Sequence, residues 1–358
     1  MNFIPFNMHQ ELKIIKTGKS KIHDVDFNRF SFGSVFTDHM FECDFIDGKW
    51  VNPIIKPYQA ISVEPSASVF HYGQAIFEGM KAYKDKNDEV WLFRPDQNFE
   101  RINKSAVRMA IPEFPKDLFF EALTNLVDIE REWVKHGEGR SLYIRPFVIG
   151  NEYAIQAVPS KNYKFMIICA PATLYYTKKL KVKVADKFSR AASGGVGYAK
   201  AAGNYAGQFY PTNLAKEEGF DQIIWTDSNE HNYLEEAGTM NVFFRINDTL
   251  ITAPTTDTIL DGVTRKSIIQ IAKDNGISVE IKKLKIDELK SAAKNGSLKE
   301  IFGAGTAAVV SEIKAFQHMG ELFELNIQND SYAERLKANL VGIQTNQLDD
   351  PHNWRYKV

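Results

Sequence analysis

The chain has 358 residues, of which 44% are hydrophobic and 25% are charged, and its 44 basic and 45 acidic side chains leave a formal net charge of −1. This length exceeds what one hydrophobic core usually serves, so two domains are expected. The composition is that of an ordinary globular protein. Because there is no net basic field, neither nucleic acid nor a membrane surface is an expected partner.

Cysteine and histidine contents exclude two further classes of protein. Cys43 and Cys169 are the only cysteines, which rules out a disulfide framework and a four-cysteine zinc site. The eight histidines form no H-x-x-x-H or H-E-x-x-H pair, so no metal site is expected. The first residues, Met1 to Pro5, do not resemble a signal peptide, and the longest apolar run, 165–172, is too short to span a membrane. A cytoplasmic protein is expected.

The first half of the chain begins with strands. Asp47-Gly48 predicts a hairpin between strands 40–45 and 49–51, because glycine accepts a positive φ. Asp96 is a candidate cap for a helix over 97–109. A second helix, ended by Gly137, is predicted from apolar residues at helical spacing. These are Phe119, Leu123, Leu126, Val127, Trp133 and Val134, which are expected in the core. Further strands are predicted at 91–93, 142–149 and 164–170.

In the second half, helices are predicted over 203–216, ended by Gly219, and over 264–273, followed by Gly276. Strands are predicted at 222–226, 242–246, 250–253, 277–281, 300–302 and 308–310. Strands with packed helices in both halves favour an α+β fold with mixed sheets over a parallel doubly wound one. The expected domains are a small N-terminal α+β domain (1–170), a linker (171–179) and a large C-terminal domain (180–358).

Two nucleotide-binding patterns are incomplete. Gly18-Lys19-Ser20 resembles the end of a P-loop, but Lys13 occupies the position of its first glycine. The segment 303–308 matches G-x-G-x-x-A, yet it leads into a strand-like sequence and not into a helix. A nucleotide-binding protein is therefore a weak alternative.

Lys200 lies in a glycine-rich segment that runs from Gly194 to Tyr205. Glycines allow close backbone approach and positive φ, and here they would let the chain pass close to a flat cofactor. A lysine screened from water loses its proton more easily and becomes a nucleophile, as a Schiff-base lysine for a carbonyl cofactor must. The alternative is a loop lysine that faces solvent.

Three other segments carry groups that such a cofactor needs. The segment 261–265 precedes a predicted helix, whose free N–H groups suit a phosphate; the alternative is plain capping by Asp261 or Thr264. The small-residue turn 303–307 offers N–H groups to an anion, or is simply a tight turn. Glu235 and Glu236 place a carboxylate where it could face a protonated heterocyclic nitrogen, or form a solvated acidic corner. Together the groups match pyridoxal 5'-phosphate.

The chain resembles the branched-chain amino acid aminotransferases of the fold-type IV pyridoxal-phosphate enzymes, from about Phe32 to the C-terminus. The matching segments are 36–40, 71–81, 143–146, the Lys200 segment, 236–241 and 262–265. The resemblance implies a two-domain architecture like that of D-amino acid aminotransferase. It also implies ping-pong transamination, in which leucine, isoleucine or valine donates the amino group and 2-oxoglutarate receives it as glutamate.

The resemblance also implies roles for individual residues. The cofactor-binding residues would be Lys200, Arg101, Tyr205, Glu236, Val263, Thr264 and Thr306, with Lys200 as the catalytic Schiff-base lysine. The substrate-binding residues would be Phe32, Tyr72, Phe77, Tyr143, Arg145, Thr239, Thr306 and Ala307. Arg145 would receive the second carboxylate of glutamate. The alternative for Arg101 is an exposed helix residue with no role in binding. The implied assembly is a homodimer, with Tyr72 and the loop Ile155 to Ala157 contributing across the interface.

One departure concerns redox control. Some members of the family have a C-x-x-C pair after the Gly-x-Gly-Thr turn, where this chain has Ala308 and Ser311, so thiol control is not expected there.

The alternative functions on the same fold are a D-amino acid aminotransferase and an aminodeoxychorismate lyase. The segment 143–146 argues against both. A non-catalytic cofactor-binding protein is disfavoured by the intact lysine, glutamate and phosphate residues.

Overall fold

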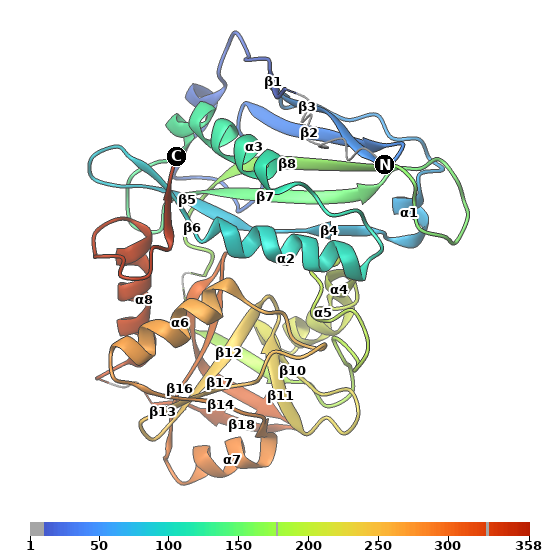
Figure 1. Cartoon of the computed structure of the whole chain (residues 1–358). Coiled ribbons are helices and arrows are strands. Elements are labelled where there is room, and N and C mark those ends of the chain that lie inside the picture. Colours follow the sequence, from blue (N-terminus) through green and yellow to red (C-terminus); the bar gives the residue numbers. More distant parts are fainter. Residues whose placement is uncertain (1–10, 177, 327–328) are drawn as a thin grey trace, which may run out of the picture. The chain divides into compact units, whose positions relative to one another are not determined.

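The computed structural model describes residues 11–176, 178–326 and 329–358 (Figure 1). Its contacts separate two compact units: residues up to Thr173 together with Lys357–Val358, and Leu174–Tyr356. Met1 to Pro5, where no signal peptide is expected, lies outside the described residues. In each unit the strand pairs of the sheet are mostly antiparallel and helices flank the sheet, so the predicted α+β class is confirmed.

In the described part of the chain, unit 1 contains a 9-stranded sheet with the order β1-β3-β2-β8-β7-β5-β6-β19, and β4 pairs with β7. The strands are β1 (Lys13–Ile14), β2 (His39–Ile46), β3 (Lys49–Pro57), β4 (Ala75–Phe77), β5 (Met80–Lys84), β6 (Val90–Phe93), β7 (Ser141–Gly150), β8 (Tyr163–Ala172) and β19 (Arg355–Lys357). The helices are α1 (Ser68–Tyr72), α2 (Pro95–Arg108) and α3 (Lys116–Ile129), with 3₁₀ turns at Ile22–Asp24 and Arg131–Trp133.

The predicted hairpin between β2 and β3 is present. Asp47 has φ 50° and Gly48 has φ 77°, the left-handed pair that a two-residue hairpin turn requires. At the other end of this unit, β8 runs to Ala172, so Pro171 and Ala172 of the predicted linker belong to a strand.

Both predicted helix boundaries in unit 1 need correction. Asp96 does not cap α2: the helix begins at Pro95, whose missing N–H suits a first turn. Arg94 occupies the cap position, and its side chain does not cap the helix. Helix α3 ends at Ile129, well before Gly137. The reason is tertiary, because the carboxylate of the next residue, Glu130, accepts the backbone N–H of His39 at 2.7 Å and lies 2.6 Å from the His39 ring.

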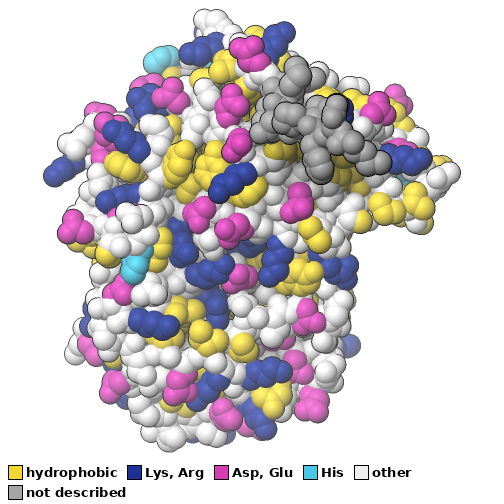
Figure 2. All heavy atoms as spheres, viewed as in Figure 1, with side chains coloured by type: hydrophobic (Ala, Val, Ile, Leu, Met, Phe, Trp, Pro, Cys, Tyr) yellow, Lys and Arg dark blue, Asp and Glu magenta, His cyan; other side chains and the backbone are white. Residues whose placement is uncertain are grey.

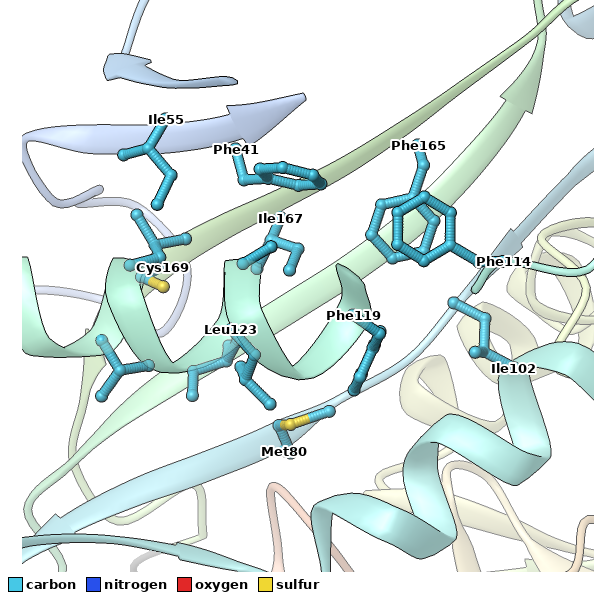
Figure 3. Close-up of a cluster of buried hydrophobic side chains, with 14 of the residues drawn as sticks. Phe41, Ile55, Met80, Ile102, Phe114, Phe119, Leu123, Phe165, Ile167 and Cys169 are labelled. Carbon is cyan, nitrogen blue, oxygen red and sulfur yellow. The ribbon is translucent and has the colours of Figure 1, made fainter. Parts of the chain in front are cut away.

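The core of unit 1 lies between the sheet and helices α2 and α3 (Figure 3). The residues predicted for this core are confirmed, since all six are at most 2% exposed. Phe114 stacks on Phe165 with ring centroids 3.9 Å apart. Along β7, Leu142, Ile144 and Val148 belong to this core. Because strand side chains alternate between faces, the core anchors β7 with its intervening residues, 143, 145 and 147, on the opposite face.

Lys81 is a buried lysine that the sequence did not single out. It is 5% exposed and lies opposite Tyr143 in the pairing of β5 with β7. Burial lowers the pKa of Lys81 from 10.5 to about 8. The unfolded chain keeps the Lys81 proton up to a higher pH than the folded chain does. The folded state is therefore destabilised as pH falls from about 10.5 to about 8.

This shift predicts a pH-dependent stability difference between the wild type and Lys81→Met. As pH falls from about 10.5 to about 8, wild-type stability should decrease relative to the variant by about 1.4 kcal/mol per pH unit. Urea unfolding of both proteins at several pH values measures the difference. Lys86→Met, at an exposed position in the turn that follows, is the control. A flat difference for Lys81→Met would contradict the prediction.

Unit 2 contains, among its described residues, a 10-stranded sheet in which β11 pairs with both β10 and β12. The strands β12, β16, β17, β9, β10 and β11 thereby form a closed ring, which has no free edge. The strands are β9 (Leu180–Val184), β10 (Gln222–Thr226), β11 (Tyr233–Ala237), β12 (Met240–Ile246), β13 (Thr249–Thr252), β14 (Ser278–Ile281), β15 (Leu284–Lys285), β16 (Leu298–Gly305), β17 (Val309–His318) and β18 (Glu321–Glu324). The helices are α4 (Gly203–Ala206), α5 (Phe209–Glu217), α6 (Val263–Asp274), α7 (Ile286–Lys294) and α8 (Tyr332–Gln344).

One predicted helix of unit 2 is interrupted. The segment 203–216 forms two short helices, α4 and α5, with a break at Gly207 and Gln208. Pro211 explains the break, because its ring clashes with the carbonyl four residues earlier, at Gly207, and it has no N–H to donate there. The other predicted helix is present as α6, and Gly276 follows it with φ 70°.

Lysine, arginine and acidic side chains are interspersed over the visible surface (Figure 2). Within the described residues, none of the helices combines the length and apolar character that a membrane crossing requires. The same residues contain no group of three or more histidine, cysteine or acidic side chains suited to a metal ion.

Candidate active site

Lys200 and Tyr205 lie together in unit 2. The Lys200 Nζ donates a hydrogen bond to the Tyr205 Oη at 2.6 Å. The residues on either side of the lysine, Ala199 and Ala201, are each 2% exposed. Asn204 joins the loop to helix α4, because its Nδ2 donates to the carbonyl of Ala199 at 2.8 Å. The lysine is therefore half-buried and oriented, and the alternative of a loop lysine facing solvent does not describe it.

The glycines before Lys200 serve the packing of this loop. A Cβ on Gly197 would lie 2.8 Å from both the Asp257 carbonyl oxygen and the Thr258 Cα. Gly194 has φ 73° and its N–H donates to the Asp257 carboxylate. Within unit 2, the glycine-rich segment therefore packs closely against the loop at 257–258.

Glu236 is the buried acid of this unit. It is 4% exposed, and its Oε1 lies 2.6 Å from Nη2 of Arg190. Its Oε2 accepts a hydrogen bond from Asn241 Nδ2 at 3.1 Å. Burial raises the pKa of Glu236, while the positive charges of Arg190 and Lys200 act in the opposite direction. The alternative of a solvated acidic corner is therefore wrong for Glu236.

Arg190 is the residue that the sequence reasoning missed. It also donates from Nη2 to the carbonyls of Gly197, at 2.9 Å, and Thr258. One guanidinium thereby joins the Lys200 loop to Glu236. The available signal was its place, four residues before the glycine-rich segment that begins at Gly194.

The start of helix α6 is a candidate phosphate site. Gly262 occupies the cap position, and no side chain caps the helix within the described residues, so the alternative of capping by Asp261 or Thr264 is wrong. Asp261 instead pairs with Lys266 at 2.8 Å. A Cβ on Gly262 would overlap the Asn241 Oδ1, so this position requires glycine. The backbone N–H groups of Val263 and the next residue, at the positive end of the helix dipole, suit a phosphate.

The turn between β16 and β17 lies next to this region. Asn241 on β12 pairs with Ala304 on β16, and a Cβ on Gly305 would lie 3.1 Å from the Thr239 carbonyl oxygen. Thr239 is therefore close to the turn that carries Thr306 and Ala307. Because a strand follows this turn, and not a helix, the dinucleotide pattern is absent there.

In unit 1, the substrate residues predicted from the sequence form an aromatic cluster around one guanidinium. The rings of Phe32 and Tyr143 meet edge to face, with centroids 4.9 Å apart. The guanidinium carbon of Arg145 lies 4.7 Å above the Phe77 ring, and its Nη2 donates to the Tyr143 Oη at 3.1 Å. The cluster combines apolar surface with one positive charge.

Arg101 is buried and held by a partner. Its Nε and Nη2 donate to the two oxygens of Glu78 at 2.7 and 2.8 Å, and the pair is 8% and 0% exposed. Asn98 adds a hydrogen bond to Glu78 at 2.7 Å. The alternative of an exposed helix residue is thus wrong. A fork–fork pair of this kind orients a guanidinium strongly. Glu78 was not singled out from the sequence.

Two residues predicted to contribute across a dimer interface are exposed. Tyr72, at the end of α1, is 45% exposed, and Ile155 in the loop after β7 is 69% exposed.

Comparisons with known proteins show the family to which the chain belongs. Residues 75–316 match the model of the amino-transferase class IV family, and the chain belongs to that family. It is 43% identical over 338 residues to the branched-chain-amino-acid aminotransferase 2 of Bacillus subtilis, covering 93% of both chains. It is 39% identical to the branched-chain-amino-acid aminotransferase of Mycolicibacterium smegmatis, over 91% of this chain and 92% of that one.

Solved structures show the same fold. A branched-chain aminotransferase from Thermoproteus uzoniensis, crystallised with norvaline, is 23% identical with a TM-score of 0.73, covering 89% of this chain and 99% of that one. The branched-chain amino acid aminotransferase of Thermobaculum terrenum in its PLP form is 19% identical with a TM-score of 0.72, covering 89% and 98%.

Proposed function

We propose that this protein transfers the amino group of leucine, isoleucine and valine to 2-oxoglutarate, with pyridoxal 5'-phosphate bound at Lys200. The observation that carries the proposal is the Lys200–Tyr205 hydrogen bond in a unit that also holds the buried Arg190–Glu236 pair. The relatives named above, at 39% and 43% identity, support the substrate class.

The donor set of unit 2 fits the cofactor. A buried carboxylate held by an arginine suits a protonated ring nitrogen, an uncapped helix start suits a phosphate, and a half-buried lysine suits an aldehyde. We infer that Glu236 binds the ring nitrogen and that Val263, Thr264 and Thr306 bind the phosphate, with Arg101. Tyr205 would hydrogen-bond the phenolic oxygen.

When bound, pyridoxal 5'-phosphate supplies an electron sink for the α-carbon of the amino acid. Lys200 would hold the cofactor covalently and would then move the proton at the substrate α-carbon. Tyr205 orients the Lys200 amine through the bond at 2.6 Å. Glu236 would hold the proton on the ring nitrogen, and the positive charge of Arg190 favours its ionised form against the effect of burial on its pKa.

Unit 1 would supply the recognition of the side chain. Phe32, Phe77 and Tyr143 offer apolar surface to a branched chain, and Arg145 offers a cation to the distal carboxylate of 2-oxoglutarate. Thr239, Thr306 and Ala307 would bind the α-carboxylate. Because both of its cysteines are buried and unpaired, a reducing compartment, the cytoplasm, is proposed.

Steady-state transamination with leucine, isoleucine, valine and D-alanine as donors and 2-oxoglutarate as acceptor tests this function. The three branched L-substrates should be used, and D-alanine should not. Preference for D-alanine would instead support a D-amino acid aminotransferase. Borohydride reduction followed by peptide mapping should place the trapped cofactor on Lys200, and a label on another lysine would refute the assignment.

A homodimer is also proposed, through an exposed apolar surface around α1 and the 153–158 loop. Phe70, Tyr72, Tyr153, Ile155 and Val158 are 45–69% exposed there, and hydrophobic side chains project at the right-hand edge of Figure 2, where Figure 1 places α1. Contiguous exposed apolar surface of this kind marks an interface. Tyr72 and the Ile155 to Ala157 loop would reach the partner's substrate pocket.

The charge variant Ile155→Glu should therefore dissociate the dimer and lower activity by about tenfold or more, because a buried unpaired carboxylate costs several kcal/mol. Sedimentation velocity measures the assembly. Ile46→Glu, at an exposed hairpin position with 42% exposure, is the control and should remain dimeric. A wild-type monomer with full activity would contradict the proposal.

A further inference from the structure

The hydroxyl of Tyr143 lies directly against the backbone of Gly79. A Cβ built on Gly79 would overlap the Tyr143 Oη and lie 2.9 Å from its Cζ. The glycine is needed here for space, since no left-handed φ is recorded for it.

The backbone at Gly79 has little freedom to yield. Its N–H donates to Glu78 Oε2 at 3.1 Å, and its carbonyl accepts from Asn98 Nδ2 at 3.3 Å. Glu78 is fully buried in its pair with Arg101. The segment between β4 and β5 is therefore held by a buried network, and a new side chain could not be accommodated by moving it.

Tyr143 is constrained as well. It is 8% exposed, and its strand pairs with β5 and β8 on either side. Its ring contacts Phe32. Because the ring is rigid, the hydroxyl can retreat from Gly79 only by rotation of the whole side chain away from its rotamer.

Arg145 takes its orientation from this hydroxyl. Its Nη2 donates to the Tyr143 Oη at 3.1 Å, and its guanidinium carbon lies 4.7 Å above the Phe77 ring and 5.3 Å above the Tyr143 ring. Displacing the phenol would remove both the hydrogen bond and one of the two aromatic surfaces.

We propose that Gly79 determines acceptance of the dicarboxylate substrate. The missing side chain lets the Tyr143 hydroxyl lie against the backbone, where it positions the Arg145 guanidinium for a distal carboxylate. Aliphatic substrates need only the apolar surface of the cluster. Gly79 is thus a positioning residue for 2-oxoglutarate and glutamate, and this inference rests on the proposed function.

Separate half-reactions test the inference. In Gly79→Ala, kcat/KM for 2-oxoglutarate with the aminated enzyme should fall by about 10- to 100-fold, the range for a lost hydrogen bond to a charged group. The leucine half-reaction should fall clearly less, because it loses only part of its apolar surface when the Tyr143 ring moves, and cofactor content should stay the same. Gly18→Ala is the matched control, because a Cβ there meets nothing within 4 Å. Equal losses in both half-reactions would overturn the inference.

A double-mutant cycle shows whether Gly79 acts through the hydroxyl. Tyr143→Phe alone should lower kcat/KM for 2-oxoglutarate. Gly79→Ala should then add much less than it does in the wild type, because the overlapping oxygen is gone and only Cζ, at 2.9 Å, still has to move. Additive losses would overturn the inference in favour of an effect through Glu78 and Arg101. If the wild type itself does not use 2-oxoglutarate, the proposed function fails. If the wild type uses 2-oxoglutarate but Gly79→Ala lowers both half-reactions equally, only the inference about Gly79 fails.

Discussion

Replacement of Lys200 by alanine is expected to lower transamination by about 10⁴-fold or more, the upper range for loss of a general acid–base group. In the proposed mechanism the variant loses both the amine that holds the cofactor and the group that moves the proton at the α-carbon. The Lys200–Tyr205 bond at 2.6 Å shows that this amine already has a defined direction. Single-turnover kinetics with leucine, followed by absorbance of the cofactor, measures the loss.

Two controls make this result specific. Lys273→Ala, at an exposed position of α6, should leave the rate unchanged. Lys200→Arg keeps a positive charge but offers no amine for a Schiff base, so it should be as inactive as the alanine variant. Turnover of leucine by Lys200→Ala at even a hundredth of the wild-type rate would refute the assignment.

Arg190→Met is expected to have the second-largest effect, a fall in kcat of about 100-fold. Arg190 is the closest cation to Glu236, at 2.6 Å, and both side chains are nearly buried. Removing one partner of a buried pair leaves an uncompensated charge, which costs about 3–5 kcal/mol unless the group becomes neutral. Glu236 would take up a proton and could no longer hold the one on the ring nitrogen.

The pH profile separates this effect from simple loss of structure. Because Arg190 lowers the pKa of Glu236 against the effect of burial, its removal raises that pKa. In the proposed mechanism the ionised carboxylate is the active form, so the acid limb of the kcat profile should move to higher pH. Arg190→Lys, which keeps a charge, should shift it less. An unmoved acid limb in Arg190→Met would contradict the assigned role.

Features that depend on neighbouring residues were visible in the sequence, whereas contacts between distant residues were not. Asp47-Gly48 predicted its hairpin because the two left-handed φ values depend on those residues alone. The helix break at Gly207 was equally local, since Pro211 was visible in the sequence, but the prediction did not use it. The end of α3 could not be predicted locally, because Glu130 binds His39, which lies far away along the chain.

The candidate site divides in the same way. The sequence by itself, with its family resemblance, singled out Lys200 and Tyr205, and it determined the α+β class and the core residues of α3. The hydrogen bond between Lys200 and Tyr205 was shown only by the structure. The Arg190–Glu236 pair, the Glu78–Arg101 pair and the contact of Tyr143 with Gly79 were decided only by the tertiary structure. Each joins residues more than twenty positions apart, and their meeting depends on strand register and on the closure of β11 onto β12. Local propensities do not specify register, because it is set by which faces of the sheets are buried together.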